Sequence, residues 1–431
     1  MRLEPVKNRN YCAIVVSLPS VRYSLNGLDN LEGVSILGYN VIVSKGSNGL
    51  GILFTAETEL SDEYCFENNL YREDSRTGNL NKDKSSKGYL EKNRRIKAIK
   101  FKGNISNALF MPLNSLSYTG IDIDLLKEGD EFDVLNGYEI CRKYEIAVKE
   151  NQNKKVVDRG FVRADKKFMP EHIDTDNFFK NWEKISPERT VIVTQKLHGT
   201  SIRIANTLVN RKLSIVERLA KFFGAKIQEM EYTYLYGSRK VIKDANNPNQ
   251  NHYYDTDIWT NEGRKLDGIL PENYIVYGEL VGWTPDGKPL QKGYTYGLPQ
   301  GKCELYIYRI TNINPRGIMT DLSWEQIKEF CSNNGLKHVP ELIKLPMYSL
   351  TMNDFKGIKE FLDVRYFDKL HGGYRNSIWL GENDLVDEGV CVRAEGLIPK
   401  ILKAKSPLFL EHETKVLDTG EEDLESSQNH E

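Results

Sequence analysis

Short, mostly apolar stretches separated by turns recur through the first 150 positions. Examples are YCAIVVSL at 11–18, NVIVSKG at 40–46 and ALFMPL at 108–113, and turns rich in Gly and Asn separate them. Many short strands with such turns predict a small all-β domain, either a barrel or a sandwich. An OB-like barrel is one member of that class, and periodicity alone does not distinguish it from the others.

The pattern changes after about residue 161, where strands are mixed with helical segments. A Ser-x-x-Gln capping box at Ser323 predicts a helix over 323–335, and the same apolar spacing recurs over 353–364. The sequence has no regular strand–helix–strand rhythm and no Gly-rich phosphate loop. We therefore expect an α+β domain of antiparallel sheets with helices, without a Rossmann or P-loop nucleotide site.

A polar, charged stretch at 149–167 separates the two patterns. This composition is typical of a connection between domains. We predict an OB-like, nucleic-acid-binding domain at 1–160 and an α+β catalytic domain at 161–431. With 431 residues, the chain is long enough for each domain to have its own core.

Composition and charge exclude several classes of protein. The six cysteines are scattered singly, which argues against structural zinc and a disulfide framework. There is no run of 18 apolar residues and no secretory signal, so we expect a cytoplasmic protein, with the nucleus as the other intracellular location, and no membrane partner. The net charge of -2 gives no general attraction to nucleic acid, which would have to come from a local patch.

One basic patch lies at 79–102, which contains nine Lys/Arg and only two acidic residues. Its end is predicted to be a strand with Ile99 and Phe101 on one face and Lys100 and Lys102 on the other. Such a strand suits a phosphate-facing surface and an ordinary solvated face equally well. The residues that would contact a nucleic-acid backbone are Arg94, Arg95, Lys97, Lys100 and Lys102.

A lysine at the end of a predicted strand raises the question of covalent chemistry. TVIVTQKL at 190–197 is rich in β-branched residues, and HGT at 198–200 predicts a tight turn into SIRIAN at 201–206, which makes a hairpin with Lys196 near its tip. A free lysine is almost fully protonated at neutral pH, and only the neutral amine attacks. Lys196 is therefore an ordinary surface lysine or, if other cations converge on it, a nucleophile.

Other charged residues could form a site with this lysine. In IPKILKAK at 398–405, alternation puts Lys403 and Lys405 on one face of a strand. Any one such residue is more often an ordinary surface charge than part of a site. The remaining candidates are Arg203, Arg239, Glu279 and Glu388.

The order of these segments resembles the ordered motifs of the covalent nucleotidyltransferases, the superfamily of polynucleotide ligases and mRNA capping enzymes. The segments are KLHGTSIR, GSRK, YGELVG, ELYIYRI, DEGVCVR and ILKAK, between Thr194 and Lys405. Within the superfamily the likeness is greatest to ATP-dependent RNA ligases. It implies a nucleotidyltransferase catalytic domain, of the ATP-grasp-like ligase type, at 161–431.

The resemblance also implies the reaction. Lys196 would attack the α-phosphorus of ATP to form lysyl-AMP, the AMP would pass to an RNA 5'-phosphate, and a 3'-OH would displace it. Lys403 and Lys405 would grip the α-phosphate.

Further roles are implied around the nucleotide. Adenine would stack on Tyr308 in preference to Tyr306. Glu279 and Glu388 would hold Mg²⁺ or Mn²⁺, with the ribose as the other partner of Glu279. The other residues implied to contact the nucleotide are His198, Gly199, Arg203 and Arg239.

Two positions depart from the superfamily pattern. His198 stands where most members have Asp, as it does in several groups of RNA ligases, and Arg309 stands where the aromatic motif usually continues with Asp. DNA ligases and capping enzymes place an OB domain after the last motif, whereas here only 26 residues follow Lys405. The N-terminal β-rich region instead resembles the RNA ligase clade that has an N-terminal OB domain.

We therefore expect an ATP-dependent RNA ligase of RNA repair that uses Mg²⁺ or Mn²⁺ and acts as a monomer on RNA, including nicked duplexes with an RNA 3'-OH strand. Two alternatives keep the chemistry and change the substrate: a DNA ligase and a capping guanylyltransferase. A third is a non-catalytic RNA-binding protein on a degenerate ligase scaffold.

Overall fold

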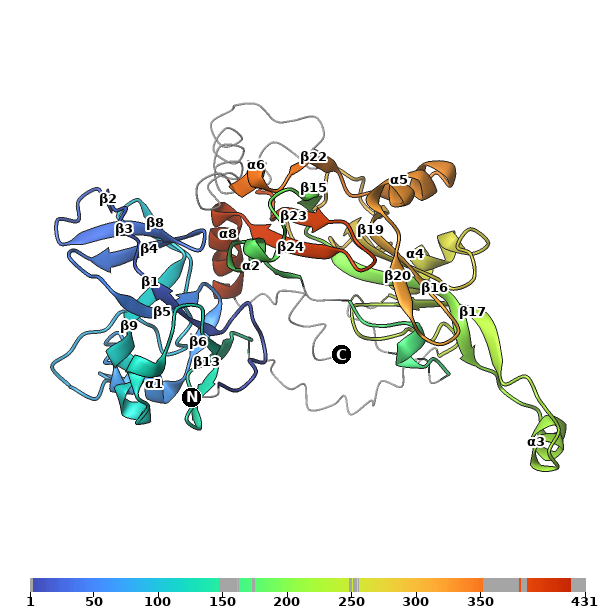
Figure 1. Cartoon of the computed structure of the whole chain (residues 1–431), viewed down its shortest axis with the longest axis horizontal. Helices are drawn as coiled ribbons and strands as arrows, with labels where there is room; N and C mark the ends of the chain where they lie inside the picture. Colours follow the sequence, from blue (N-terminus) through green and yellow to red (C-terminus); the bar gives the residue numbers. More distant parts are fainter. Residues whose placement is uncertain are drawn as a thin grey trace. The chain divides into compact units, whose positions relative to one another are not determined.

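The computed structural model describes residues 3–146, 161, 163–172, 175–247, 250, 254, 256–351, 380 and 386–419 (Figure 1). The chain divides into two compact units. The first contains residues 1–148 and 405–422, and the second contains residues 149–404 and 423–431. The sequence division at 160/161 assigned the whole C-terminal part to one domain, whereas residues 405–422 belong with the N-terminal unit.

The first unit is built on a seven-stranded sheet with the order β10-β1-β5-β9-β4-β3-β2. Its strands are β1 (Ala13–Ser17), β2 (Tyr23–Ser24), β3 (Leu31–Ile36), β4 (Tyr39–Ser44), β5 (Leu50–Thr55), β9 (Ala108–Pro112) and β10 (Glu131–Phe132). Except for the parallel pair β4/β9, the paired strands are antiparallel. Closure into an OB-like barrel stays a prediction.

Smaller elements complete the first unit. The paired strands are β6 (Thr58–Leu60) with β13 (Cys141–Lys143), β7 (Ile99–Phe101) with β8 (Asn104–Ser106), and β11 (Val134–Leu135) with β12 (Tyr138–Glu139). The helices are α1 (Asp62–Glu67), two 3-10 helices at Leu113–Thr119 and Ile123–Leu125, and α8 (Pro407–Asp418). Ser406 caps α8 and Pro407 occupies its first turn, so the last predicted strand passes directly into this helix.

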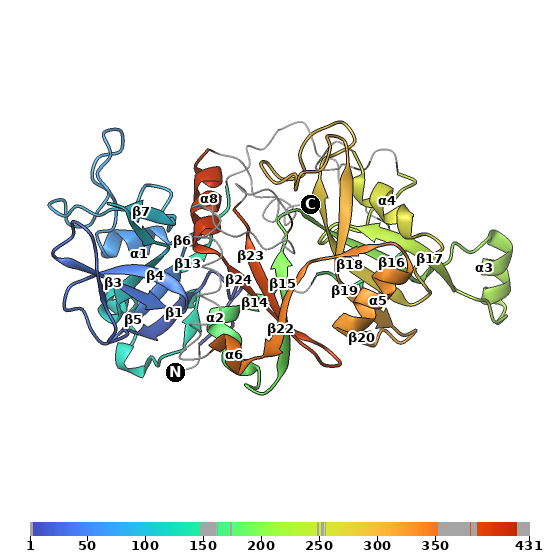
Figure 2. The same cartoon turned by 90° about the horizontal axis from the view of Figure 1, so that it is seen from above.

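The second unit contains two mostly antiparallel sheets (Figure 2). The five-stranded sheet has the order β14 (Asp176–Asn177), β24 (Lys400–Lys405), β23 (Gly389–Ala394), β15 (Thr190–Lys196) and β22 (Glu341–Pro346). The six-stranded sheet has the order β17 (Met230–Gly237), β16 (Thr200–Asn210), β18 (Tyr274–Gly282), β19 (Cys303–Ile313) and β20 (Met319–Asp321), and β21 (Lys337–His338) pairs with β19. The predicted α+β class is confirmed.

The second unit also contains helices. They are α2 (Phe178–Asn181), α3 (Ile215–Phe222), α4 (Ile258–Gly263), α5 (Trp324–Asn333) and α6 (Tyr348–Thr351), with 3-10 helices at Lys166–Phe168, Trp182–Lys184 and Arg264–Leu266. The predicted capping box is confirmed, since Ser323 and Gln326 cap α5 reciprocally. Trp259 of α4 and Trp324 of α5 are buried in the core over the six-stranded sheet. The helix predicted at 353–364 lies outside the described residues.

The predicted hairpin around Lys196 is wrong. β15 pairs with β22 and β23 of one sheet, whereas β16 pairs with β17 and β18 of the other. The turn at 197–199 therefore carries the chain from sheet to sheet. Local pattern could not show this, because the partners of β15 lie at residues 341–346 and 389–394, far away in the sequence.

Among the helices that the structure describes, none combines the length and apolar character needed to span a bilayer.

Candidate active site

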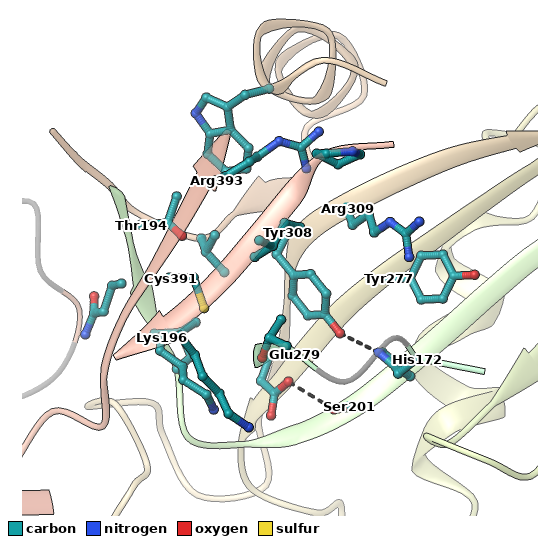
Figure 3. Close-up of a pocket in the computed structure, with 18 of the residues that line it drawn as sticks. His172, Thr194, Lys196, Ser201, Tyr277, Glu279, Tyr308, Arg309, Cys391 and Arg393 are labelled. Carbon is teal, nitrogen blue, oxygen red and sulfur yellow. Dashed lines mark hydrogen bonds between the residues drawn. The ribbon is translucent and has the colours of Figure 1, made fainter. Parts of the chain in front are cut away.

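A cavity of about 270 Å³ lies in the second unit (Figure 3). Residues of both sheets line it, including the last residues of β15 and the facing parts of β18, β19, β23 and β24. Because β15 crosses to β16 at this point, the end of the strand that carries Lys196 opens on the cavity. The sequence-predicted residues among its lining are Lys196, Arg239, Glu279, Tyr308 and Lys403.

Lys196 lies against a buried carboxylate. In the β15/β23 register it is opposite Gly389, which places the preceding Glu388 beside it. The Lys196 Nζ is 2.6 Å from Glu388 Oε1, and the Glu388 side chain is only 2% exposed. A buried charge must be paired, so this contact fixes both side chains at the edge of the cavity.

Cys391 shows that four of the predicted residues converge. Burial raises the pKa of its thiol to about 11. Lys196 and Lys403 act to lower this pKa, while Glu388 and Glu279 act to raise it, so all four charges lie within electrostatic range of one sulfur atom. In Figure 3 the sulfur lies beside Lys196.

Glu279 is held by the turn after Lys196. Its Oε1 accepts from the Gly199 amide at 3.2 Å, and its Oε2 accepts from the Ser201 hydroxyl at 3.4 Å. A Cβ on Gly199 would lie 2.2 Å from the Leu280 carbonyl oxygen, which no real contact allows. Gly199 thus lets the turn approach β18 closely enough to bind its carboxylate.

His198 supports the turn from outside the lining. Its amide donates to the Tyr296 hydroxyl at 2.7 Å, and its ring meets the Tyr294 ring edge-on with centroids 4.7 Å apart. Its Nδ1 is 3.7 Å from Glu388 Oε2. His198 can therefore steady the carboxylate that pairs with Lys196.

Tyr308, and not Tyr306, belongs to the cavity wall. Tyr277 pairs with Arg309 and Gly278 with Ile307, so Tyr308 is the extra residue of a β-bulge in β19. Its hydroxyl lies 2.7 Å from His172 Nδ1. Burial raises the pKa of Tyr308 well above its usual value, and nearby Glu279 raises it further, so the ring stays neutral.

Arg309, which departs from the superfamily pattern, is neutralised within the wall. Its Nε and Nη2 both donate to the Asp321 carboxylate, with Nη2 to Oδ2 at 2.9 Å, and the Asp321 side chain is fully buried. The guanidinium also lies over the Tyr277 ring, 5.1 Å from the centroid. Asp321 of β20 therefore balances the charge of Arg309.

Arg203 lies outside the set of described residues that line the cavity, and its contact with the nucleotide stays a prediction. Its guanidinium is buried and donates to the carbonyls of Ser238 at 2.8 Å and of Met169 and Pro170 at 3.0 Å. Burial lowers its pKa to about 10. Arg203 holds two segments in place, one preceding Arg239 and the other preceding His172, so its geometry is that of a positioning residue.

The two lysines of β24 have different surroundings. Lys403 lines the cavity. Lys405 lies beyond the described lining, and its Nζ is 2.8 Å from Glu413 Oε1 of α8, with the Phe409 ring also below the amine. Strand alternation predicted equivalent roles for the pair, but the helix that follows supplies Lys405 with a carboxylate.

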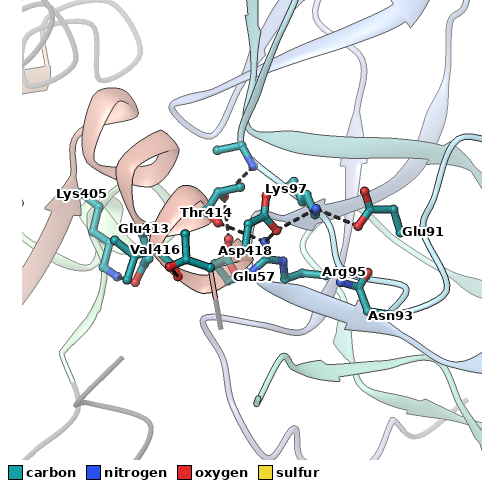
Figure 4. A network of polar contacts seen from close by, with 12 residues as sticks. Glu57, Glu91, Asn93, Arg95, Lys97, Lys405, Glu413, Thr414, Val416 and Asp418 are labelled. Carbon is teal, nitrogen blue, oxygen red and sulfur yellow. Dashed lines mark hydrogen bonds and ion pairs between the residues drawn. The ribbon is translucent and has the colours of Figure 1, made fainter. Parts of the chain in front are cut away.

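The basic stretch predicted to bind nucleic acid is largely folded against its own unit (Figure 4). The Arg95 side chain is only 1% exposed; it contacts Asp418, and its Nη1 is 3.3 Å from Glu57 Oε2. Lys97 lies 2.8 Å from both Glu91 and Asp418. These side chains hold α8, and this corrects their predicted exposure to phosphate.

The other members of the basic stretch differ among themselves. Arg94 is bound to Glu59 at 2.5 Å. Lys100 is half exposed, 3.4 Å from Glu411, and Lys102 is exposed and donates to the Gly27 carbonyl at 3.2 Å. Lys100 and Lys102 are thus the members of the stretch that solvent reaches most readily.

His172 and Tyr277 are among the residues of the wall that sequence reasoning missed. The ring of Tyr277 lies 5.2 Å from that of His172 and faces it edge-on. Tyr277 precedes Glu279 by two residues in β18, so strand alternation could have predicted it. No local signal marks His172, which lies in an irregular segment and reaches the cavity through tertiary packing.

Within the described ranges, no three His, Cys, Asp or Glu side chains form a metal-binding group. Glu279 lines the cavity, and Glu388 pairs with Lys196 at its edge, so the site offers two carboxylates. Mg²⁺ is typically bound by one or two carboxylates together with substrate phosphates, so this pair fits a metal that arrives with a nucleotide.

A family model described as RNA ligase matches residues 189–405, half of the chain. The chain belongs to the RNA ligase family. The match begins just before β15 and ends at the last residue of β24, so it encloses most of the cavity wall. RNA is accordingly the substrate class of this family.

Solved structures of Naegleria gruberi RNA ligase share the fold of this RNA ligase. A mutant with ATP and Mn has a TM-score of 0.56 and 15% identity, and the alignment covers 95% of this chain and 99% of that chain. The same protein with PPi has a TM-score of 0.56 and 15% identity, with coverage of 94% and 98%. No curated protein matches the chain.

Proposed function

We propose that this chain is an ATP-dependent RNA ligase that joins a 3'-OH and a 5'-phosphate through a lysyl-AMP intermediate on Lys196. The observation that supports this most strongly is the position of Lys196, 2.6 Å from Glu388 at the edge of a cavity lined by Lys403, Arg239 and Glu279. An ordinary surface lysine would not need a buried carboxylate and further cavity-lining charges around it. The fold shared with Naegleria gruberi RNA ligase, solved with ATP and Mn and with PPi, agrees with it.

In the first step the Lys196 amine attacks the α-phosphorus of ATP. A P–N bond forms, the bond from the α-phosphorus to the bridging oxygen breaks, and pyrophosphate leaves with the electron pair. Lys196 must first lose a proton, and Glu388 is placed to accept it. Lys403 and Arg239 would neutralise the charge that develops on the phosphates.

In the next steps an oxygen of the RNA 5'-phosphate attacks the same phosphorus, and the P–N bond breaks to restore Lys196. The 3'-OH then attacks the 5'-phosphorus, and AMP leaves. Glu279 and Glu388 would hold Mg²⁺ or Mn²⁺ together with the phosphates, and the ion would supply additional positive charge against the leaving pyrophosphate.

The other end of the cavity would receive adenine. Tyr308 presents a half-buried ring whose hydroxyl is fixed by His172. An aromatic ring stacks on any base, so ring geometry alone does not select ATP over GTP. Asp321 removes the net charge of Arg309 nearby, which keeps this end suited to an uncharged base.

The test is covalent labelling with α-labelled ATP and Mg²⁺ or Mn²⁺. Wild type is expected to take up label and Lys196→Ala to take up none. Lys344→Ala removes a half-exposed lysine from β22 of the same sheet and should label normally. Label on Lys196→Ala, or none on wild type, would contradict the mechanism.

Substrate comparisons test the finer proposals. Label from ATP in preference to GTP, and sealing of RNA in preference to DNA on the 3'-OH side of a nick, would separate an RNA ligase from a DNA ligase and a capping enzyme. RNA binding without any label would favour the non-catalytic alternative. We further propose that the enzyme acts as a monomer on nicked duplexes in RNA repair, which sedimentation and a panel of nicked and single-stranded ends would test.

A further inference from the structure

Helix α3 carries an apolar face that the rest of the described chain leaves uncovered. The helix fills the connection between β16 and β17 and lies beyond the end of β17 in both views (Figures 1 and 2). It contains no buried residue. The exposed fractions are 77% for Ile215, 75% for Val216, 54% for Leu219, 82% for Phe222 and 81% for Phe223.

The helix is nevertheless well formed at its start. Ser214 and Glu217 make a reciprocal capping box, and Arg211 pairs with Glu217 at 2.5 Å. An isolated helix of two turns is marginal in water, and these contacts offset part of that cost. Elaborate capping of an otherwise unsupported, apolar helix indicates that its exposed face has a use.

The apolar face is wide. At about 100° per residue, Ile215, Leu219 and Phe222 lie within about 60° of one another. Val216 and Phe223 lie roughly 40–60° further around the helix, so the face spans about 120°. A narrow groove that reads one line of anchors would leave the second group in water. A broad, flat apolar surface would cover both.

The polar surroundings of the helix are basic. Residues 211–226 contain five Lys/Arg and one Glu. Arg211 and Lys221 are in ion pairs, with Glu217 and Glu229, whereas Lys212, Arg218 and Lys226 are exposed. The surface that meets this helix should therefore be apolar and anionic.

We propose that α3 binds the surface of an anionic lipid membrane, with its apolar face in the interface and its cations toward the headgroups. A wide apolar face, a charged opposite face and flanking Lys/Arg are the features of helices that lie in a membrane interface. A second copy of the chain would bring together two equally basic segments, which repel each other. RNA would satisfy the cations but would leave Ile215, Val216 and Leu219 without apolar partners.

This proposal revises the expectation of no membrane partner. That expectation came from the lack of an 18-residue apolar run, which concerns only segments that cross a bilayer. Interfacial binding needs only one apolar helix face. The sequence analysis predicted no helix between the strands on either side of α3, so this face was not considered. The proposal is independent of the ligase reaction, because α3 contributes no residue to the described cavity lining.

The test is flotation of the full-length protein with vesicles of phosphatidylcholine containing about 30% phosphatidylserine, compared with pure phosphatidylcholine. Wild type should float with the anionic vesicles, and high salt should weaken this. Phe222→Asp/Phe223→Asp should lower vesicle affinity at least roughly tenfold. Val21→Asp changes a residue that is 78% exposed in the first unit and should leave binding unchanged.

Charge reversal and covalent labelling complete the test. Arg218→Glu/Lys226→Glu should also weaken vesicle binding at least roughly tenfold, since each basic residue near an anionic surface adds about fivefold in affinity. All variants should still label with ATP, which confirms that they fold. Absence of binding to anionic vesicles would overturn the proposal. The proposal would also fail if the Phe222/Phe223 variant abolished a dimer or an RNA affinity of the wild type while its vesicle binding stayed unchanged.

Discussion

The lysines around the cavity and the basic stretch at 94–102 look alike in sequence but are used differently. Lys196 and Lys403 come from neighbouring parts of one sheet and open on a cavity. Arg95 and Lys97 turn toward α8 and are paired with its acids. The comparison teaches that the density of positive charge along the chain does not predict which cations line a cavity.

The position of the opposite charges in the sequence decides whether the use of a basic residue can be predicted. Asp418, which pairs with Arg95, lies 323 positions away in the sequence. A short sequence window around the basic stretch therefore does not include Asp418. At the cavity, by contrast, the segments that supply charge were recognisable as an ordered set, so their convergence was predictable.

The largest effect is expected from Lys403→Ala. Removing a cavity-lining cation that, under the proposed function, would grip the α-phosphate should slow covalent labelling on the order of 10²–10³-fold. Lys405→Ala is the matched control, because its amine is bound to Glu413 and should contribute less to the same step. Equal losses in the two variants would show that Lys405 leaves Glu413 to reach the nucleotide.

The next largest effect is expected from Arg95→Ala. It leaves Glu57 buried without its cation and removes the contact with Asp418, so the free energy of unfolding should fall by about 3 kcal/mol. Chemical denaturation measures this loss. Arg142→Ala, which removes a largely exposed cation from Glu59, should cost about 1 kcal/mol or less. If Arg95 instead served RNA, its substitution would weaken RNA binding without destabilising the fold.

A pH dependence should follow from Glu57. Burial, followed by the nearby Glu413, raises its pKa to about 7 from 4.5. The folded state then holds a proton that the unfolded state has lost, so this group stabilises the fold fully below pH 4.5 and loses that effect as pH rises through about 7. The loss is at most about 3 kcal/mol, and Glu57→Gln should flatten this part of the stability profile. An unchanged profile in Glu57→Gln would contradict the assignment.

The smallest effect is expected from Lys100→Ala and Lys102→Ala. Both side chains are at the surface, so each substitution should change stability by no more than about 0.5 kcal/mol. If they contact phosphates, each should lower the salt dependence of RNA binding by about one counterion. A salt titration of RNA affinity measures this, and unchanged slopes would remove the last members of the basic stretch from the nucleic-acid surface.

The sequence predicted the second unit better than the first. The α5 capping box, the strand that carries Lys196 and the Tyr308 ring were all predictable, because caps, β-branched runs and ordered motifs are local signals. The sheet crossover after Lys196 and the pairing of Lys405 with Glu413 were not, because each depends on partners that only the fold supplies. Arg203 was placed at the nucleotide by resemblance, but its bonds to three backbone carbonyls depend on segments on both sides of it in the sequence.

The close approach of Gly199 to β18 has a consequence for sequence variation. Every other amino acid would place a Cβ 2.2 Å from the Leu280 carbonyl oxygen, so position 199 should accept glycine alone in a saturation library selected for ligation. Leu197, two residues earlier, needs only to fill its buried space, and other apolar residues should survive there. The number of tolerated amino acids would thus fall from several at position 197 to one at position 199.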